Sequence, residues 1–416
     1  MKTTFITAIL VLFTGMLVHS QKVETLNDII HEINRSNPTV KMYEAQIRSM
    51  LEAAKGARGR MPVDIGTGLW MAPYNAKMWR KGDNGQPGMG QYMISVQQMF
   101  PNKKQQNAQA AYMEAMPAAE NERFIYELKQ RHADAKERYY ALVILKKKTR
   151  SLEENERVLN FMIKDAEIRY RNGLDKLSAY YKAKAELGNI MSMKLELENE
   201  INQQRIGLNT LMNRNKLEIF DVDTTYIIKD YQSLPIDSGH LGNRSEIKAI
   251  DKDLQLTGLQ QKAEAAKTKP EFGVRYEHMF GFGGLPMQYT LMGMARIPFG
   301  RANSMSRANV ESLKWKSEAL AQQKQLLLNE ASGKAAALIN EMVLKKNQVK
   351  LFEETIIPAL RKNYQVIQLG YQQNTEDLFT LFDAWDTLNK TQSSYLSQLQ
   401  QLLGMQVEFE RVMEIN

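Results

Sequence analysis

Two long stretches of this chain carry apolar residues at helical spacing. In the second stretch the apolar side chains recur every three, four or seven positions, with charged residues between them. They are Leu338, Met342, Val349, Phe352, Ile356, Leu360 and Ile367. A stripe of this kind predicts helices that bury one side in a coiled-coil-like seam.

The two helical runs cover residues 103–169 and 301–369, and their only helix breakers are Pro117 and Pro358. At 1.5 Å per residue each run would be about 100 Å long, so both helices must pack against neighbours along their length. Each proline removes one helical hydrogen bond. The pattern leaves open whether the prolines kink the helices or lie at local unwinding.

Four shorter stretches alternate apolar and polar residues with the period of two that a β-strand requires. Their alternating positions are Val63, Ile65, Thr67, Leu69 and Met71; Tyr92, Ile94, Val96 and Phe100; Phe272, Val274, Tyr276 and Phe280; and Tyr289, Leu291 and Ile297. Each stretch has about ten residues, the length of a tilted membrane strand. Polar positions such as Asp64, Arg275, Glu277 and Arg296 would then face water and the apolar positions lipid. Two soluble hairpins, each with a small core, also fit this alternation.

The loops inside the two strand pairs, 73–88 and 281–286, contain several Gly and Pro residues. Neither has the Lys-Ser/Thr pair or the strand-to-helix setting of a phosphate-binding loop. We expect both loops to be exposed turns.

The two halves of the chain follow one order of elements: a helix, two strands, a very long helix, a break and a return helix. Gln91-Tyr92 and Phe100-Pro101 correspond to Gln288-Tyr289 and Ile297-Pro298 at a constant offset of 197 positions. We therefore predict a first repeat over residues 21–212, a linker over 213–243 and a second repeat over 244–416.

The breaks after the long helices also correspond. Tyr170-Arg-Asn-Gly173-Leu174 matches Tyr371-Gln-Gln-Asn374-Thr375 at an offset of 201 positions. Gly and Asn adopt the left-handed backbone conformation most readily, so each can end one helix and let the chain reverse into the next.

The first residues have the pattern of a secretory signal. Lys2 precedes an apolar run from Phe5 to Val18, and His19, Ser20 and Gln21 follow it. The run has 14 residues, fewer than the ~20 that span a bilayer as a helix. We expect a signal peptide over residues 1–20, cleaved after Ser20, rather than a membrane anchor.

Composition narrows the chemistry. The chain has 55 Lys and Arg residues against 47 Asp and Glu, and it has no Cys. Without Cys a disulfide scaffold, a cysteine-zinc site, a thiol enzyme and an N-terminal lipoprotein anchor are excluded. The positive charges form no basic block, which argues against nucleic acid as a partner. The His residues show no metal-ligand spacing, so we expect neither an enzyme nor a bound cofactor or metal ion.

The duplicated helix-strand-strand-helix order, the Pro after each second strand and the aromatic-x-x-Gly turn together resemble the outer-membrane efflux family typified by TolC. The resemblance implies a mainly α fold with membrane β-strands. Three protomers would each supply four strands to one 12-stranded outer-membrane β-barrel and their helices to a long periplasmic α-helical barrel. Such a homotrimer would lie in the cell outer membrane as the passive exit duct of a tripartite efflux system, served by an inner-membrane pump and a periplasmic adaptor.

The resemblance also implies roles for the residues at the helix breaks. In the family the turns contact the adaptor, which would assign this role to Tyr170, Gly173, Leu174, Tyr371, Asn374 and Thr375. Asn374 departs from the family's usual Gly. Carboxylates after the second turn line a closed periplasmic aperture; Asp383 retains one of these positions, and Asp377 and Glu376 lie nearby, where they would supply the charge missing at the other. Thr380 occupies one usually acidic position, and a solvated acid near a helix start is the alternative role for Asp383.

Two questions stay open at this stage. A soluble periplasmic coiled-coil adaptor or scaffold is the alternative function, although the duplicated strand pairs would have no role in it. The transported substrate is also undetermined. The chain has 24 Met residues, and soft thioethers suit Cu(I), so heavy-metal (Cu/Ag) export is an alternative to drug or small-molecule export. Methionine that simply fills apolar surfaces is the competing explanation.

Overall fold

The computed structural model describes residues 23–59, 61–173, 176–298 and 300–415, so the expected signal peptide and Leu174 lie outside the described residues. The chain divides into two compact units. The helical unit comprises Met1–Asn37, Arg131–Asp230 and Glu341–Glu408. The sheet unit comprises Pro38–Gln130, Tyr231–Asn340 and Phe409–Asn416. Each unit therefore contains segments from both predicted repeats.

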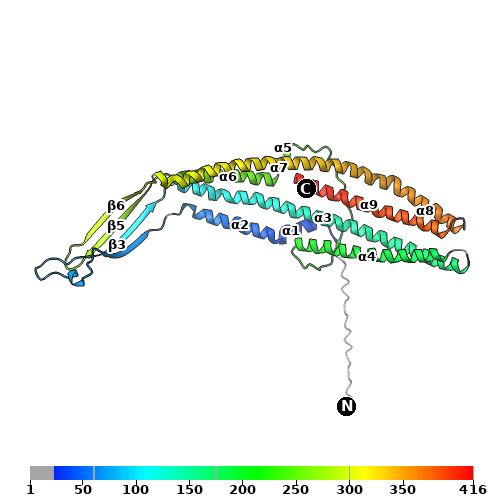
Figure 1. Ribbon diagram of the computed structural model, residues 1–416, viewed down its shortest axis with the longest axis horizontal. Coiled ribbons are helices and arrows are strands. Elements are labelled where there is room, and N and C mark those ends of the chain that lie inside the picture. The colour runs from blue at the N-terminus through cyan, green and yellow to red at the C-terminus, as the bar shows by residue number, and fades with distance from the viewer. Residues whose placement is uncertain (1–22, 60, 174–175, 299, 416) are drawn as a thin grey trace, which may run out of the picture. The chain divides into compact units, whose positions relative to one another are not determined.

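Most of the chain is helical, and Figure 1 shows the elements in their order. The helices are α1 (Leu26–Ser36), α2 (Pro38–Lys55), α3 (Lys103–Arg171), α4 (Leu177–Leu211), α5 (Ser238–Leu241), α6 (Ser245–Ala266), α7 (Ser304–Leu351), α8 (Ile357–Gln372) and α9 (Leu378–Met413). The strands are β1 (Val23–Glu24), β2 (Asp64–Trp70), β3 (Gln91–Phe100), β4 (Asp221–Val222), β5 (Glu271–Gly281) and β6 (Gln288–Arg296). The order α2-β2-β3-α3-α4 recurs as α6-β5-β6-α7-α8-α9. The predicted long helices and the four predicted strands are confirmed.

The two prolines of the long helices behave differently. Pro117 lies inside α3, which continues through it over 69 residues. Pro358 is preceded by a π-helical segment, Phe352–Ile356, in which the N–H of Ile357 donates to the carbonyl of Phe352. Widening the helix in this way accommodates a residue that has no N–H and whose ring crowds the preceding turn. The second long run is thus helical throughout but locally unwound.

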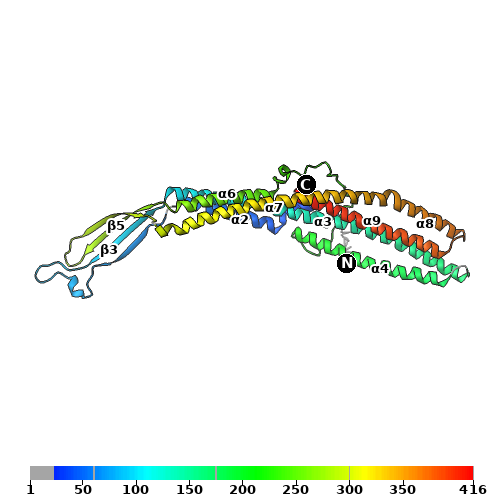
Figure 2. The same ribbon diagram turned by 45° about the horizontal axis from the view of Figure 1, so that its top comes forward.

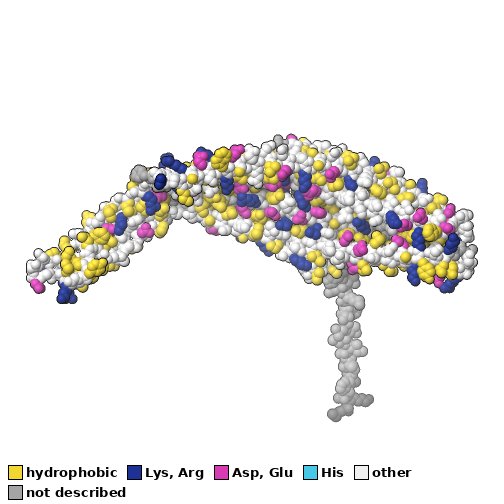
Figure 3. Space-filling view, viewed as in Figure 1, with side chains coloured by type: hydrophobic (Ala, Val, Ile, Leu, Met, Phe, Trp, Pro, Cys, Tyr) yellow, Lys and Arg dark blue, Asp and Glu magenta, His cyan; other side chains and the backbone are white. Residues whose placement is uncertain are grey.

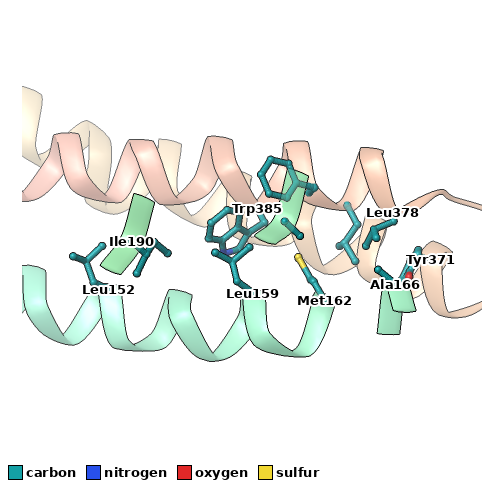
Figure 4. Packing of buried hydrophobic residues seen from close by; sticks show 11 residues of the cluster. Leu152, Leu159, Met162, Ala166, Ile190, Tyr371, Leu378 and Trp385 are labelled. Carbon is teal, nitrogen blue, oxygen red and sulfur yellow. The ribbon is translucent and has the colours of Figure 1, made fainter. Parts of the chain in front are cut away.

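In the helical unit, α8 and α9 run side by side, and so do the end of α3 and α4 (Figures 1 and 2). A hydrophobic cluster joins these helices. Its buried members are Leu152, Leu159, Met162, Ala166, Ala183, Ile190, Tyr371, Leu378, Leu381, Phe382 and Trp385. Figure 4 shows Leu159 and Met162 of α3 packed beside Trp385 of α9. This buried seam provides the neighbours that such long helices need.

A buried ion pair ties the start of the helical unit to the segment predicted as a linker. β1 pairs in parallel with β4. Beside this pair, the Glu24 carboxylate, 3% exposed, accepts from two nitrogens of Arg214 at 2.7 and 3.2 Å. The Arg214 guanidinium also lies over the ring of Phe220, 4.4 Å from its centroid. The first part of the segment predicted as a linker is therefore packed against the start of the helical unit.

The sheet unit contains one antiparallel four-stranded sheet in the order β2-β3-β5-β6. Alternation along the strands puts one set of side chains on each face. The exposed apolar face carries Ile65, Leu69, Tyr92, Ile94, Val96, Phe100, Phe272, Val274, Tyr276, Phe280, Tyr289 and Leu291. The polar face carries Ser95, Gln97, Arg275 and Glu277, and the last two form an ion pair. The alternation predicted from the sequence is confirmed, and no layer among the described residues covers the apolar face.

The two strand-connecting loops pack on each other. The N–H of Gly88 donates to the carbonyl of Gly283 at 3.0 Å. The indole of Trp79 stacks on Phe282 with a centroid distance of 5.2 Å and donates to the carbonyl of Pro73 at 2.8 Å. The sequence predicted exposed turns, and the structure adds that aromatic stacking joins the two loops.

The surface shows mixed charge. On the face drawn in Figure 3, Lys and Arg side chains are interspersed with Asp and Glu over the helices. None of the helices in the described part of the chain combines the length and hydropathy needed to cross a bilayer.

The Glu24–Arg214 pair yields the first testable prediction. Glu24→Ala removes the buried carboxylate that binds the largely buried guanidinium of Arg214, so the free energy of unfolding should fall by about 3 kcal/mol. Glu218 also faces Arg214, at 3.6 Å, but it is 46% exposed and serves as the matched control. Glu218→Ala should change the free energy by at most about 1 kcal/mol. Urea unfolding followed by circular dichroism measures both, and equal effects would contradict the assignment.

Candidate functional site

The candidate site lies where α3 and α8 end in the helical unit. Gly173 (φ 74°) and Asn374 (φ 59°) both adopt the left-handed conformation predicted for them. At the second break the N–H of Thr375 donates to Gly370 O at 2.9 Å and that of Asn374 to Tyr371 O at 3.1 Å. These two bonds form a Schellman motif, which satisfies the last carbonyls of α8 and reverses the chain into α9.

The first break shows the matching bond. The N–H of Gly173 donates to Tyr170 O at 2.9 Å. The following residue, Leu174, is outside the described residues. The two turns therefore share a backbone design, as their sequence correspondence predicted.

The two tyrosines at these turns differ in environment. Tyr170 is 45% exposed, whereas Tyr371 is 3% exposed and belongs to the hydrophobic cluster. A buried side chain is not available to a partner protein. The structure thus corrects the equivalence drawn from the sequence, because the ring of Tyr371 lies inside the unit and only that of Tyr170 lies at its surface.

Tyr371 joins a polar network that connects α3 to the second turn. Its hydroxyl donates to Asp165 Oδ2 at 2.5 Å. Arg169 donates to the same Asp165 oxygen at 3.0 Å, to the carbonyl of Tyr371 at 3.0 Å and to Asn374 Oδ1 at 2.7 Å. The Arg169 guanidinium also covers the Tyr371 ring, 4.1 Å from its centroid. We call Asp165, Arg169, Tyr371 and Asn374 the latch, because they hold the end of α3 against the end of α8.

The predicted aperture residues divide into two kinds. Asp377 caps α9: its Oδ1 accepts from the backbone N–H and from the hydroxyl of Thr380, both at 2.8 Å. The backbone hydrogen bond, and after it the hydroxyl one, hold the pKa of the Asp377 carboxyl below its usual value. Glu376 and Asp383 are both exposed, and Asp383 lies between the buried residues Phe382 and Ala384. The packing of α9 therefore directs the Asp383 carboxylate away from the cluster.

Two further contacts hold this part of α9 in place. Trp385 Nε1 donates to Asn155 Oδ1 at 3.0 Å, and the amide of Asn155 donates to Asn389 Oδ1 at 2.5 Å. The ammonium of Lys182 on α4 lies over Phe379 and Phe382, 4.0 and 4.4 Å from the ring centroids. Asp383 is thus carried on a helix with fixed orientation.

Asp165 and Arg169 were missed from the sequence. Their spacing of four residues is typical of a surface ion pair along one helix. No local signal shows that this pair reaches Tyr371 and Asn374, about 200 positions later. Only the fold brings them together.

The comparisons with known proteins identify the fold. No family model matches the sequence, and no curated protein matches it. The outer-membrane channel OprN is similar in structure, with a TM-score of 0.76 and 14% identity, over 94% of this chain and 90% of OprN. CusC, which forms a transmembrane channel, gives a TM-score of 0.77 and 12% identity, over 94% of this chain and 92% of CusC. The Campylobacter jejuni outer-membrane channel CmeC gives 0.74 and 12% over 93% and 85%.

At these identities the comparison establishes the fold. The chain has the mainly α architecture of outer-membrane channels, with a four-stranded sheet, along nearly its whole length. The fold class and the resemblance to TolC-like proteins predicted from the duplicated pattern are confirmed at this level.

The latch makes the second prediction. Asn374→Gly keeps the left-handed turn and removes only the acceptor for Arg169, which should cost about 1 kcal/mol. Asn374→Ala removes the same acceptor and adds strain of about 1 kcal/mol in the left-handed region. Hydrogen exchange of the amides at Thr375 and Glu376 should therefore accelerate more in the Ala variant. Equal protection in both variants would mean that the turn is held by other contacts.

Proposed function

We propose that this chain is one protomer of a homotrimeric outer-membrane duct. The duct would belong to a tripartite efflux system, receiving substrate from an inner-membrane pump through a periplasmic adaptor and releasing it outside. It would act passively, without catalysis and without a cofactor. Support comes from the fold shared with outer-membrane channels and, above all, from the sheet.

The observation that carries the proposal is a sheet with one exposed apolar face and two outer strands, β2 and β6. In lipid the backbone groups along an open strand edge would cost several kcal/mol each. Three copies in which β6 of one pairs with β2 of the next would close 12 strands and leave no edge. The apolar face would then meet lipid, and the polar face with Gln97, Arg275 and Glu277 would line the lumen.

The helices would form the periplasmic tunnel. The two turns, with Tyr170, Gly173 and Leu174 in one and Asn374 and Thr375 in the other, would contact the adaptor. Tyr371 would position the second turn through the latch rather than touch the partner. Secretion would require cleavage after Ser20, and residues 21–212 and 244–416 would be the two repeats joined by the linker over 213–243.

The aperture would depend on Asp383. Three copies around the trimer axis would bring three exposed carboxylates into a ring that attracts cations. Glu376 would add charge nearby. Asp377 and Thr380 would contribute mainly by capping α9, because their side chains bond to each other. The latch would resist separation of α8 from α3 when the aperture opens.

A soluble periplasmic scaffold accounts less well for the sheet. It would leave twelve apolar or aromatic side chains of one face in water, far more than scattered surface residues require. In a membrane β-barrel, an apolar face of this kind is the surface that contacts lipid.

The third prediction tests the trimer. Because the chain has no native Cys, introduced pairs report only their own proximity. Thr67→Cys in β2 is combined in turn with Cys at Tyr289, Leu291, Gly293 and Ala295 in β6, in protein from the outer-membrane fraction. One or two neighbouring combinations should give covalent dimers and trimers on oxidation.

The matched control is Thr67→Cys with Val274→Cys, because Val274 belongs to an inner strand and should not cross-link between copies. Soluble monomers without cross-links in any combination would overturn the duct and favour the scaffold. Planar-bilayer recording of the same trimers should show discrete conductance.

The fourth prediction concerns the aperture. Asp383→Ala should raise single-channel conductance, because a shorter side chain widens the constriction, and it should weaken block by multivalent cations, because the carboxylate ring loses its charge. Glu198→Ala, an exposed carboxylate on α4, is the control and should leave both unchanged. Unaltered conductance and block in Asp383→Ala would remove this residue from the constriction.

A further inference from the structure

Methionine is distributed unevenly over the two faces of the sheet. Five methionines lie within the four strands: Met93, Met99, Met279, Met292 and Met294. The register puts all five on the polar face. Within these described strands, the apolar face has none.

This distribution argues against methionine as a general apolar filler. Such a residue would be expected on the apolar face. That face is instead built from Ile, Leu, Val, Phe and Tyr. The methionines share their face with the polar residues Gln97, Arg275 and Glu277.

Two of the five converge on one point, and a third lies on the same face two residues away along β6. Met99 pairs with Gly273, and Gly273 pairs with Met294 on its other side. A Cβ at Gly273 would collide with Met99 Sδ and lie 3.2 Å from Met294 Cε, so both thioethers bend over the space that the glycine leaves. Met292, on the same face and two residues before Met294, lies beside Arg275.

The charges around this point do not exclude a cation. Arg275 is paired with Glu277, and Arg296 with Glu271 at 3.2 Å. With Asp64 the face carries three carboxylates against two guanidinium groups. No group of three or more His, Asp or Glu able to hold a metal occurs in the described residues, so a hard-ligand site does not compete in that part of the chain.

We propose that Met99, Met292 and Met294 form a thioether site for a soft monovalent cation, Cu(I) or its analogue Ag(I). Thioethers select such ions over the harder divalent cations. The site is defined by the sheet of one chain. Its meaning for export, a soft metal ion as cargo meeting the lumen wall, rests on the proposed function.

The test uses full-length trimers in nanodiscs and Ag(I) as the probe. Competition titration should show Ag(I) binding, and X-ray absorption at the silver edge should show sulfur ligands. Replacing all three residues with Leu keeps their volume. This triple variant should bind at least about tenfold more weakly, equivalent to about 1.4 kcal/mol.

Two further variants separate ligation from packing. Gly273→Ala keeps every sulfur but fills the space under Met99 and Met294, and it should also weaken binding. Met191→Leu on α4, where Met191 is 49% exposed, is the control and should leave affinity unchanged. Wild-type affinity in the triple variant, or silver with only nitrogen or oxygen ligands, would overturn the site.

The same samples distinguish failure of this inference from failure of the duct. Trimers that conduct but bind no Ag(I) would remove the thioether site and leave the duct intact. Sulfur-ligated Ag(I) on a chain that neither trimerises nor conducts would retain the site and remove its role in export.

Discussion

The backbone edges of the two outer strands, β2 and β6, must be hydrogen-bonded, and the rest of the structure depends on how this is done. A backbone edge can face water or another strand, but in lipid only another strand satisfies it. Four strands cannot curl far enough to pair with each other, since outer-membrane barrels begin at about eight strands. In the proposed membrane setting, a sheet with this apolar face would therefore need further copies of itself. Oligomerisation would then follow from hydrogen bonding rather than from an added property of the surface.

The helical unit has a different requirement, which is a packing partner along each long helix. Its helices are too long to be stable alone, and the cluster around Leu159, Met162 and Trp385 gives them a continuous partner. Duplication supplies two turns with the same backbone design, but only the second shows a side-chain hydrogen bond to the neighbouring long helix among the described residues. Asn374 takes the left-handed conformation that Gly173 also takes, and in addition its side chain accepts from Arg169. The departure from Gly thus couples the turn to α3.

Much of this was predictable because it follows from local periodicity. Helical spacing gave the long helices, alternation gave the strands of the sheet, and Gly or Asn marked the reversals. What could not be predicted depends on contacts between distant segments. The Tyr371–Asp165 hydrogen bond and the Glu24–Arg214 ion pair each join residues separated by well over a hundred positions. The burial of Tyr371 likewise depends on the helices that pack around it. The π-helical segment before Pro358 was also beyond the pattern, since a kink and local unwinding remove the same hydrogen bond. The roles of Asp383 and of the turns remain predictions.

Alternation also explains why neighbouring residues of one strand lie on faces with different chemistry. Leu291 lies on the apolar face and Met292 on the polar one, so a shift of one residue would exchange them along the whole strand. The ladder from β2 to β6 fixes the register, and Gly273 reinforces it because only a residue without a side chain leaves room for Met99 and Met294 together. The features that fix the sheet against slipping are therefore the same ones that gather the sulfurs. A thioether site at this position requires no loop or added element, only the pairing that closes the strands.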